Sequence, residues 1–235
     1  MTSVRTRRVG HKGAAEIEHG NTTASFDAAL SFGVDMIEFD VLSARPDGTG
    51  ELYVAHDYED LASRGPLTFA EALDHLTDAR FDEVEFDVDI KLPGYETRVL
   101  EMLRERELVD RVLVSGMFPD GLAAMRAAQP GLRVGWSVPR VKRDYTERRA
   151  TRLPAYAALV AYRAALPRRV GRAIRAGRCD AIMANWRVVT PALLASVRRA
   201  GGELFVWTVD DAARIQSLEA LGVDGIITND PRLFS

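Results

Sequence analysis

The sequence of 235 residues contains a single cysteine, Cys179, which excludes an internal disulfide bond and any zinc site built from four cysteines. No stretch approaches the roughly 18 to 20 apolar residues that a bilayer-spanning helix needs, and no apolar run follows the basic opening residues. The glycine-rich nucleotide motifs GxGxxG and GxxxxGK(S/T) are absent as well. These absences predict a cytoplasmic protein without disulfides or a membrane anchor.

Neither sign of charge is in large excess. The chain has 31 basic and 34 acidic side chains, a net charge of −3, which gives no electrostatic reason to expect a nucleic-acid partner. Hydrophobic residues make up 47% of the chain and charged residues 28%, as in ordinary soluble globular proteins. The length suits one domain over residues 1–235.

Short runs rich in β-branched residues alternate with longer segments of helical period. Eight such units in about 235 residues predict a (β/α)8 barrel, and an open doubly wound sheet is the alternative. The expected strands are Arg8–His11, Met36–Leu42, Val84–Lys91, Arg111–Ser115, Leu132–Ser137, Asp180–Asn185, Leu204–Val209 and Asp224–Thr228. An additional run, Glu51–His56, follows the turn-forming residues 46–50 and predicts a hairpin beyond the second strand.

Polar side chains gather at the carboxyl ends of the first three expected strands, where barrel enzymes have their active sites. Residues spaced i and i+2 face the same side of a strand. Glu38 and Asp40 therefore share one face of their strand, and Asp89 and Lys91 share one face of theirs. The polar residues are His11, Glu38, Asp40, Asp89 and Lys91, with His56 closing the additional run.

The carboxylates Glu38, Asp40 and Asp89 would repel one another unless they were protonated or bridged by a hard divalent cation. The two histidines, His11 and His56, are suited to proton transfer near neutral pH. Taken singly, each of these residues also fits a structural role, as a solvated turn, a cap or a packed side chain. Asp87, on the same face of its strand as Asp89, is expected to be structural.

Several short motifs together resemble the glycerophosphodiester phosphodiesterases, metal-dependent enzymes built on a (β/α)8 barrel. Each motif is two to four residues long, so their order and spacing carry the resemblance, which spans the whole chain. The motifs are His11-Lys12-Gly13, His19-Gly20-Asn21-Thr22, Glu38-Phe39-Asp40, His56-Asp57 and Asp89-Ile90-Lys91, followed near the end by residues 206–209 and 222–231.

The resemblance implies that Glu38, Asp40 and Asp89 hold a divalent metal ion, Mg²⁺ or Ca²⁺, with Mn²⁺ as a further candidate. It implies that His11 and His56 are the general acid and base. The implied substrate-binding residues are Lys12, Asn21, Lys91 and Trp207. The implied reaction is hydrolysis of a glycerophosphodiester to an alcohol and glycerol 3-phosphate, in which the glycerol 2-hydroxyl attacks phosphorus and water then opens a cyclic phosphate.

Three positions depart from the family pattern. Lys12 replaces an arginine and loses the planar fork that binds a phosphate through two parallel hydrogen bonds. Gly20 replaces a glutamate, which lowers the expected metal affinity unless His19 or Glu18 compensates. Asp89 replaces a glutamate, as in the related sphingomyelinase D-like phospholipases. The short segment after His56 predicts a reduced insertion domain and an open site.

Residues 140–178 contain twelve basic and two acidic side chains, a local net charge of +10, while the rest of the chain carries −13. This segment predicts either peripheral contact with an anionic membrane or a solvated helical face that pairs with acidic groups or a second subunit. Tyr156, Tyr162 and Trp136 are expected to line a route for an apolar substrate tail, which would favour a lysolipid. Two other functions stay open: a lysophospholipase D-like enzyme that releases a cyclic phosphate, and a catalytically silent barrel that binds phosphorylated ligands.

Overall fold

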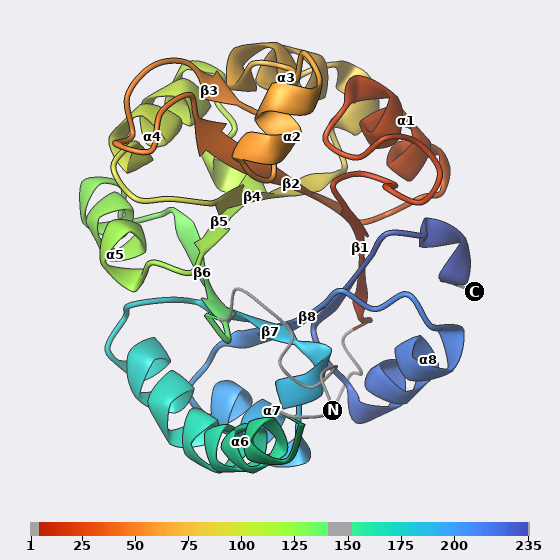
Figure 1. Ribbon diagram of the computed structural model, residues 1–235, viewed down its shortest axis with the longest axis vertical. Coiled ribbons are helices and arrows are strands. Elements are labelled where there is room, and N and C mark those ends of the chain that lie inside the picture. Colours follow the sequence, from red (N-terminus) through yellow and green to blue (C-terminus); the bar gives the residue numbers. More distant parts are fainter. Residues whose placement is uncertain (1–4, 141–151, 235) are drawn as a thin grey trace.

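Eight parallel strands close into a barrel that is surrounded by helices (Figure 1). The computed structural model describes residues 5–140 and 152–234. Each barrel strand pairs in parallel with its neighbours, and pairing of the first strand with both the second and the last closes the ring. The barrel strands are β1 (Arg7–His11), β2 (Met36–Ser43), β4 (Glu85–Ile90), β5 (Val112–Gly116), β6 (Arg133–Val138), β7 (Ala181–Asn185), β8 (Glu203–Trp207) and β9 (Gly225–Thr228). The predicted (β/α)8 barrel is therefore confirmed.

One further strand, β3 (Leu52–Tyr53), lies outside the barrel. It pairs antiparallel with the end of β2, as the expected hairpin requires. It is shorter than the sequence suggests. His56 does not close this strand but lies three residues beyond it, before the helix α2 (Tyr58–Ser63). Asp57 caps α2 by accepting hydrogen bonds from the backbone N–H groups of Glu59 and Asp60. The pairing with β2 thus ends at Tyr53, and Asp57 starts α2 four residues later.

The outer helices begin and end where the sequence supplies caps. Thr22 and Thr68 form capping boxes at two helix starts, and Gly222 ends the last helix in the left-handed conformation. Within the described residues no helix combines the length and the apolar character needed to cross a bilayer. The helices are α1 (Thr23–Ser31), α3 (Phe69–Leu76), α4 (Glu96–Glu105), α5 (Pro119–Ala128), α6 (Arg152–Arg175), α7 (Pro191–Arg199) and α8 (Ala212–Leu221).

The apolar core has two parts because side chains alternate between the two faces of each strand. Outward-facing residues pack against the helices in the larger part, which includes Phe39, Phe86 and Val114. Inward-facing residues fill the middle of the barrel: Val9, Met36, Leu113, Ala181, Met183, Phe205 and Ile227. The barrel is thus a packed interior rather than a pore.

A ring of four charged side chains closes the amino-terminal end of the barrel. Arg7, Glu85, Arg133 and Glu203 come from β1, β4, β6 and β8, which are alternate strands of the barrel. Arg7 contacts Glu203 at 2.7 Å and Glu85 at 3.6 Å, while Arg133 contacts the same two carboxylates at 2.8 and 3.2 Å. Each charge therefore has two partners of opposite sign.

This ring predicts a pH-dependent loss of stability in Glu203→Gln. Burial alone would raise the pKa of Glu203, but Arg7 and Arg133 outweigh it and lower the pKa below the ordinary 4.5. The stabilisation is therefore complete above pH 4.5 and is lost as the pH falls through the folded-state pKa. We expect Glu203→Gln to lower the free energy of unfolding by about 1–3 kcal/mol at pH 7, and the difference to become smaller as the pH falls below 4.5.

Urea titrations of both proteins at pH 7 and pH 3 check this expectation. Glu101→Gln on the exposed surface of α4 is the matched control and should change the free energy of unfolding by less than ~0.5 kcal/mol. Equal stability of the Glu203→Gln variant and the unaltered protein at pH 7 would contradict the role of the ring.

Candidate active site

Three carboxylates meet at the carboxyl end of the barrel. Asp40 on β2 lies in register with Asp89 on β4, and Glu38 lies two residues before Asp40 on the same strand face. One oxygen from each of these side chains lies within 4.8 Å of the others. Asp40 is fully buried and Glu38 is nearly so. The structure therefore brings together the three residues that the sequence singles out as a metal cluster.

Two lysines provide positive charge to this cluster. The ammonium of Lys91 contacts Asp40 Oδ1 and lies 2.5 Å from Asp89 Oδ2, while Lys12 Nζ lies 3.5 Å from Asp40 Oδ2. Burial alone would raise the pKa of Asp40, but the two lysines outweigh it and hold the pKa well below its usual range. The carboxylate of Asp40 is therefore ionised at neutral pH.

Negative charge nevertheless exceeds what the lysines offset. Burial, and next the charge of Asp40, raise the pKa of Glu38 well above its ordinary value. One layer deeper, burial and the nearby Asp89 raise the pKa of Asp87 to about 8, and Asp87 Oδ1 has no hydrogen-bond partner. Asp87 is buried beneath the cluster, away from the mouth.

The donor set fits a hard divalent cation. Three carboxylates supply the oxygen ligands that Mg²⁺ and Ca²⁺ prefer, and the raised pKa of Glu38 shows a buried group that added positive charge would stabilise. The cluster can therefore hold a metal ion through Glu38, Asp40 and Asp89.

Asn21 holds Asp40 in position through two hydrogen bonds. Its side-chain Nδ2 donates to Asp40 Oδ2 at 2.9 Å, and its Oδ1 accepts from the backbone N–H of Asp40 at 3.2 Å. The side chain is 1% exposed, so both ends of the amide are already used inside the protein. These two hydrogen bonds hold the amide against Asp40 on β2, and the implied substrate contact of Asn21 stays a prediction.

His11 at the end of β1 is held in one tautomer. Its Nδ1–H donates to Asn229 Oδ1 at 2.6 Å, and Asn229 Nδ2 donates to Asp210 at 2.6 Å, which fixes the orientation of the amide. The other ring nitrogen, Nε2, faces Glu38 Oε2 at 3.8 Å. Burial lowers the pKa of His11 to about 4, so the imidazole is neutral at pH 7 and Nε2 can accept a proton.

Sequence reasoning missed Asn229 and Asp210. Asn229 lies within a matched motif, and its position directly after the last strand is the signal that could have drawn attention to it. Asp210 follows β8 and also accepts hydrogen bonds from Thr228 and from the backbone N–H of Asn229. Together the loops after β8 and β9 orient His11.

His56 lies apart from the buried group, and its side chain is 50% exposed. Its Nδ1–H donates to Asp57 Oδ2 at 3.0 Å, which leaves Nε2 as the nitrogen available for proton transfer. His56 is nevertheless close enough for its charge to lower the pKa of Asp40. The open position agrees with the short segment between β2 and α3, which contains only β3 and the six-residue α2.

Trp207 lies half-buried at the end of β8, and its indole N–H donates to the backbone carbonyl of Met183 at 2.8 Å. The ring packs against the inner core. Trp136 faces outward from the barrel, with the guanidinium of Arg169 5.9 Å from its ring centre. The expectation that Trp136 lines a substrate route is therefore wrong, because its strand alternation turns it away from the mouth.

Gly20 packs directly against the loop after β1. A Cβ atom at this position would lie 2.9 Å from Lys12 Cβ and 3.1 Å from Ala15 Cβ, so the loop has no room for a side chain there. Neither of the two residues expected to compensate for the missing glutamate joins the acidic cluster. His19 is exposed, with Nδ1 on the carbonyl of Gly20, and Glu18 is exposed as well.

Asn229→Ala is expected to reduce kcat by ~10- to 100-fold, because the imidazole of His11 would lose the partner that fixes its tautomer and orientation. Initial rates under saturating metal and substrate measure the effect. Asn185→Ala serves as the control, because Asn185 also lies at the carboxyl end of a barrel strand but its side chain caps a short turn by accepting from the backbone N–H of Arg187. Unchanged turnover in Asn229→Ala would show that His11 needs no such partner.

Known proteins resemble this chain over most of its length. Residues 67–233 match the model of the glycerophosphoryl diester phosphodiesterase family. A glycerophosphodiester phosphodiesterase from Caldanaerobacter subterraneus is 24% identical, with 97% of this chain and 96% of that protein covered. One from Bacillus altitudinis is 25% identical, with 96% and 95% covered.

Solved structures show the same fold. A glycerophosphoryl diester phosphodiesterase from Agrobacterium tumefaciens superposes with a TM-score of 0.76 at 20% identity, covering 97% of this chain and 95% of that one. A phosphodiesterase from Oleispira antarctica, solved in complex with the product sn-glycerol-3-phosphate, gives a TM-score of 0.70 at 16% identity, covering 97% and 94%.

Proposed function

The chain belongs to the glycerophosphoryl diester phosphodiesterase family, and we propose that it hydrolyses glycerophosphodiesters to an alcohol and glycerol 3-phosphate. The observation that carries this proposal is the convergence of a neutral His11 with Glu38, Asp40 and Asp89 at one barrel mouth. These groups combine a proton acceptor with a cation site, which are the two needs of phosphodiester cleavage.

Glu38, Asp40 and Asp89 would hold the divalent cation, with Mg²⁺ or Ca²⁺ as the first candidates and Mn²⁺ as a further one. When bound, such an ion neutralises phosphoryl oxygens and lowers the barrier to attack at phosphorus. Asn21 keeps Asp40 in position through its two hydrogen bonds. Lys12 and Lys91, which now contact Asp40, supply the remaining positive charge for a phosphate at the mouth.

The two histidines divide the proton transfers. His11 accepts the proton of the glycerol 2-hydroxyl at Nε2, because its imidazole is neutral and its Nδ1–H is held by Asn229. His56 donates a proton to the departing alkoxide from Nε2, with Asp57 orienting its ring. Attack by the 2-hydroxyl would give a cyclic phosphate that water then opens. Trp207 at the end of β8 is the proposed side chain against which the substrate packs.

A lysophospholipase D-like reaction that stops at the cyclic phosphate is the second candidate. The observation that favours it is the open mouth, because His56 is half exposed and the segment between β2 and α3 contains only β3 and α2. The silent binding barrel is less favoured, since the acidic cluster and His11 are held in a defined geometry. A cytoplasmic location and the absence of a nucleic-acid partner stay predictions from the sequence.

The test is turnover of a panel of glycerophosphodiesters and lysophospholipids with Mg²⁺, Ca²⁺ or Mn²⁺, and with chelator. Phosphorus NMR identifies the product, because a cyclic phosphate and glycerol 3-phosphate have distinct resonances. Release of glycerol 3-phosphate that requires a metal is the expected result. Accumulation of the cyclic phosphate would favour the second candidate, and no turnover with any metal would sink the hydrolase proposal.

A further inference from the structure

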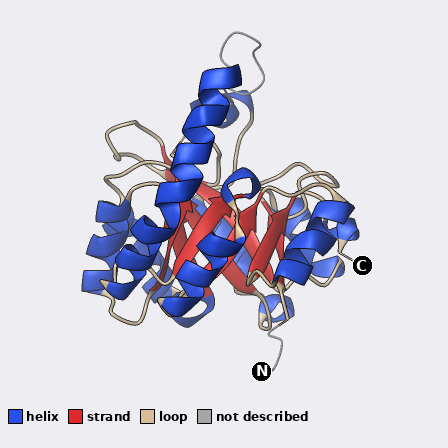
Figure 2. Ribbon diagram, turned by 90° about the horizontal axis from the view of Figure 1, so that it is seen from below, coloured by secondary structure: helices blue, strands red, loops and turns tan. Residues whose placement is uncertain are grey.

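The helix α6 rises beyond the carboxyl end of the barrel (Figure 2). Its inner part packs on the barrel, where Leu166 and Val170 are buried and Ser196 of α7 donates to the carbonyl of Pro167. Arg163 Nε donates to the carbonyl of Arg187, in the turn η3 (Trp186–Val188) that directly follows the end of β7. Position 163 is therefore level with the mouth, and the residues before it extend past the mouth.

The exposed surface of α6 changes character along its length. Between residues 156 and 165, which we call the α6 arm, every exposed side chain is apolar: Tyr156, Ala157, Ala158, Val160, Ala161, Ala164 and Ala165. Tyr156 is 47% and Val160 63% exposed. A helical face that meets only water normally carries charged residues. The α6 arm carries none on its exposed face and spans about 14 Å at 1.5 Å per residue.

Arginines replace the apolar residues nearer the barrel. The exposed side chains of α6 after the arm and up to its last residue are Arg168, Arg169, Arg172 and Arg175. No acidic residue occurs between Arg152 and Arg178. Residues 141–151 of the basic segment lie outside the described residues, so this pattern rests on α6 alone. An apolar end followed by a collar of arginines matches the order of acyl chains and anionic headgroups at a bilayer surface.

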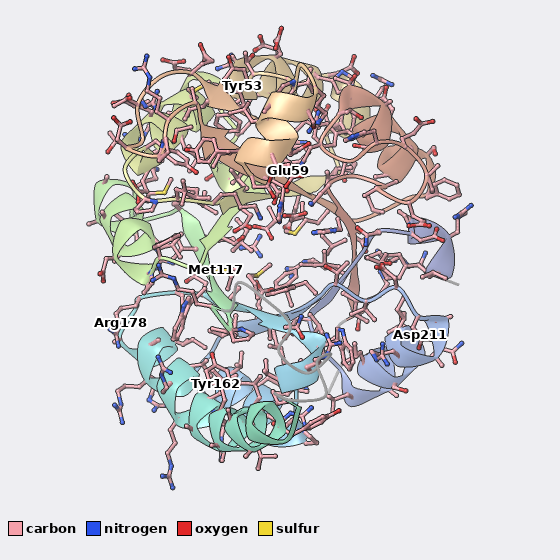
Figure 3. The ribbon with its side chains drawn as sticks, viewed as in Figure 1. Tyr53, Glu59, Met117, Tyr162, Arg178 and Asp211 are labelled. Carbon is pink, nitrogen blue, oxygen red and sulfur yellow. The ribbon has the colours of Figure 1, made fainter. Side chains whose placement is uncertain are left out.

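Further arginines surround the same half of the mouth. Arg187 after β7 and Arg214 in the first turn of α8 both contact the ring of Trp186, with guanidinium carbons 4.4 and 3.9 Å from its centre. Arg140 after β6 lies 4.4 Å from the ring centre of Phe118. Tyr162 on α6 and Glu59 on α2 lie on opposite sides of the barrel (Figure 3), so this basic rim is across the mouth from the loop that carries His56.

From these contacts we propose that the α6 arm and its arginine collar dock the barrel mouth onto an anionic lipid bilayer. Charge complementarity selects the occupant, because a surface with this many arginines and no acidic residue on its helix favours anionic headgroups. The arm projects on the mouth side, so docking turns the active site toward the lipid. The substrate would then be a phosphodiester presented by the bilayer, a step that rests on the proposed hydrolase activity.

The test is cosedimentation of the full chain with vesicles of phosphatidylcholine alone or with 30% phosphatidylglycerol. Binding to the anionic vesicles is expected, together with a marked loss in 0.5 M NaCl, because salt screens the arginines. Val160→Glu is expected to weaken this binding by at least ~10-fold, since it places a carboxylate in the inserted face. Arg168→Ser with Arg172→Ser should also weaken it.

Phe32→Glu is the matched control. Phe32 is also an exposed apolar residue, 44% exposed, but it follows α1 and precedes β2, at the opposite end of the barrel. This variant should bind vesicles like the unaltered chain. Equal binding by Val160→Glu and the unaltered chain, or no binding to anionic vesicles, would overturn the proposal. A dimer in sedimentation velocity that Val160→Glu disrupts would overturn it too, because a second copy would then cover the arm.

Activity measurements separate this proposal from the proposed function. Hydrolysis of a water-soluble glycerophosphodiester should be the same in Val160→Glu and the unaltered chain, which also shows that the variant folds. Hydrolysis of a lysophospholipid in anionic vesicles should fall with vesicle binding. If the unaltered chain binds vesicles but hydrolyses neither substrate, the hydrolase proposal is wrong and the docking proposal stands. If it hydrolyses the soluble substrate but does not bind vesicles, the docking proposal is wrong and the hydrolase proposal stands.

Discussion

His11→Ala is expected to lower kcat by ~10² to 10⁴, the usual contribution of a positioned proton acceptor. The loss follows from the geometry, because alanine removes Nε2 beside Glu38 while the carboxylate cluster remains in place. KM should change much less than kcat, since the lysines and the cation site are untouched. Steady-state rates on a water-soluble glycerophosphodiester with saturating metal measure both constants.

His19→Ala provides the control for a histidine near the same loop. His19 is exposed and its ring contacts only the carbonyl of the following residue among the described hydrogen bonds. Its removal should leave kcat within about twofold of the unaltered protein. If His11→Ala kept more than a tenth of the original kcat, His11 would not be the proton acceptor, and its hydrogen bond to Asn229 would have only a structural meaning.

Asp40→Asn is expected to weaken Mg²⁺ binding by at least ~10², more than the ~10- to 100-fold cost of losing an outer partner of a metal ligand. Asparagine keeps the size of the side chain but removes the negative charge of Asp40, which forms ion pairs with Lys12 and Lys91. The metal concentration that gives half-maximal rate should rise accordingly. Titration calorimetry with Mg²⁺ measures the same change without depending on catalysis.

Asp47→Asn is the matched control for this substitution. Asp47 lies in the exposed hairpin turn between β2 and β3, where its carboxylate accepts hydrogen bonds from Thr49. The Asp47→Asn variant should reach half-maximal rate at the same metal concentration as the unaltered protein. An Asp40→Asn variant that bound Mg²⁺ with the original affinity would show that Asp40 is not a ligand of the ion.

The barrel could be predicted from sequence because strand and helix signals are local. The eight strands lie within one or two residues of their expected ends, since runs such as Met36–Leu42 are set by β-branched and aromatic residues. The cluster of Glu38, Asp40 and Asp89 was also predictable, because strand alternation and the shared carboxyl ends of parallel strands place such residues together.

Contacts between distant loops could not be predicted in the same way. The hydrogen bonds from Asp210 through Asn229 to His11 join residues about two hundred positions apart, and only the closure of β1 on β9 brings them together. Asn21 illustrates the same limit. A motif placed it near the site, but only the fold shows that its amide faces Asp40.

The close approach of Gly20 to the loop after β1 bears on how the missing glutamate could be regained. A single Gly20→Glu exchange would force Cβ against the Cβ atoms of Lys12 and Ala15, and an arginine at position 12 would have its Cβ in the same place. Gly20→Glu therefore requires the loop that carries Lys12 and Ala15 to shift, whether position 12 is lysine or arginine. Lys12→Arg beside the native Gly20 creates no such contact, so the arginine of the family pattern can return alone, whereas the glutamate needs a rearranged loop.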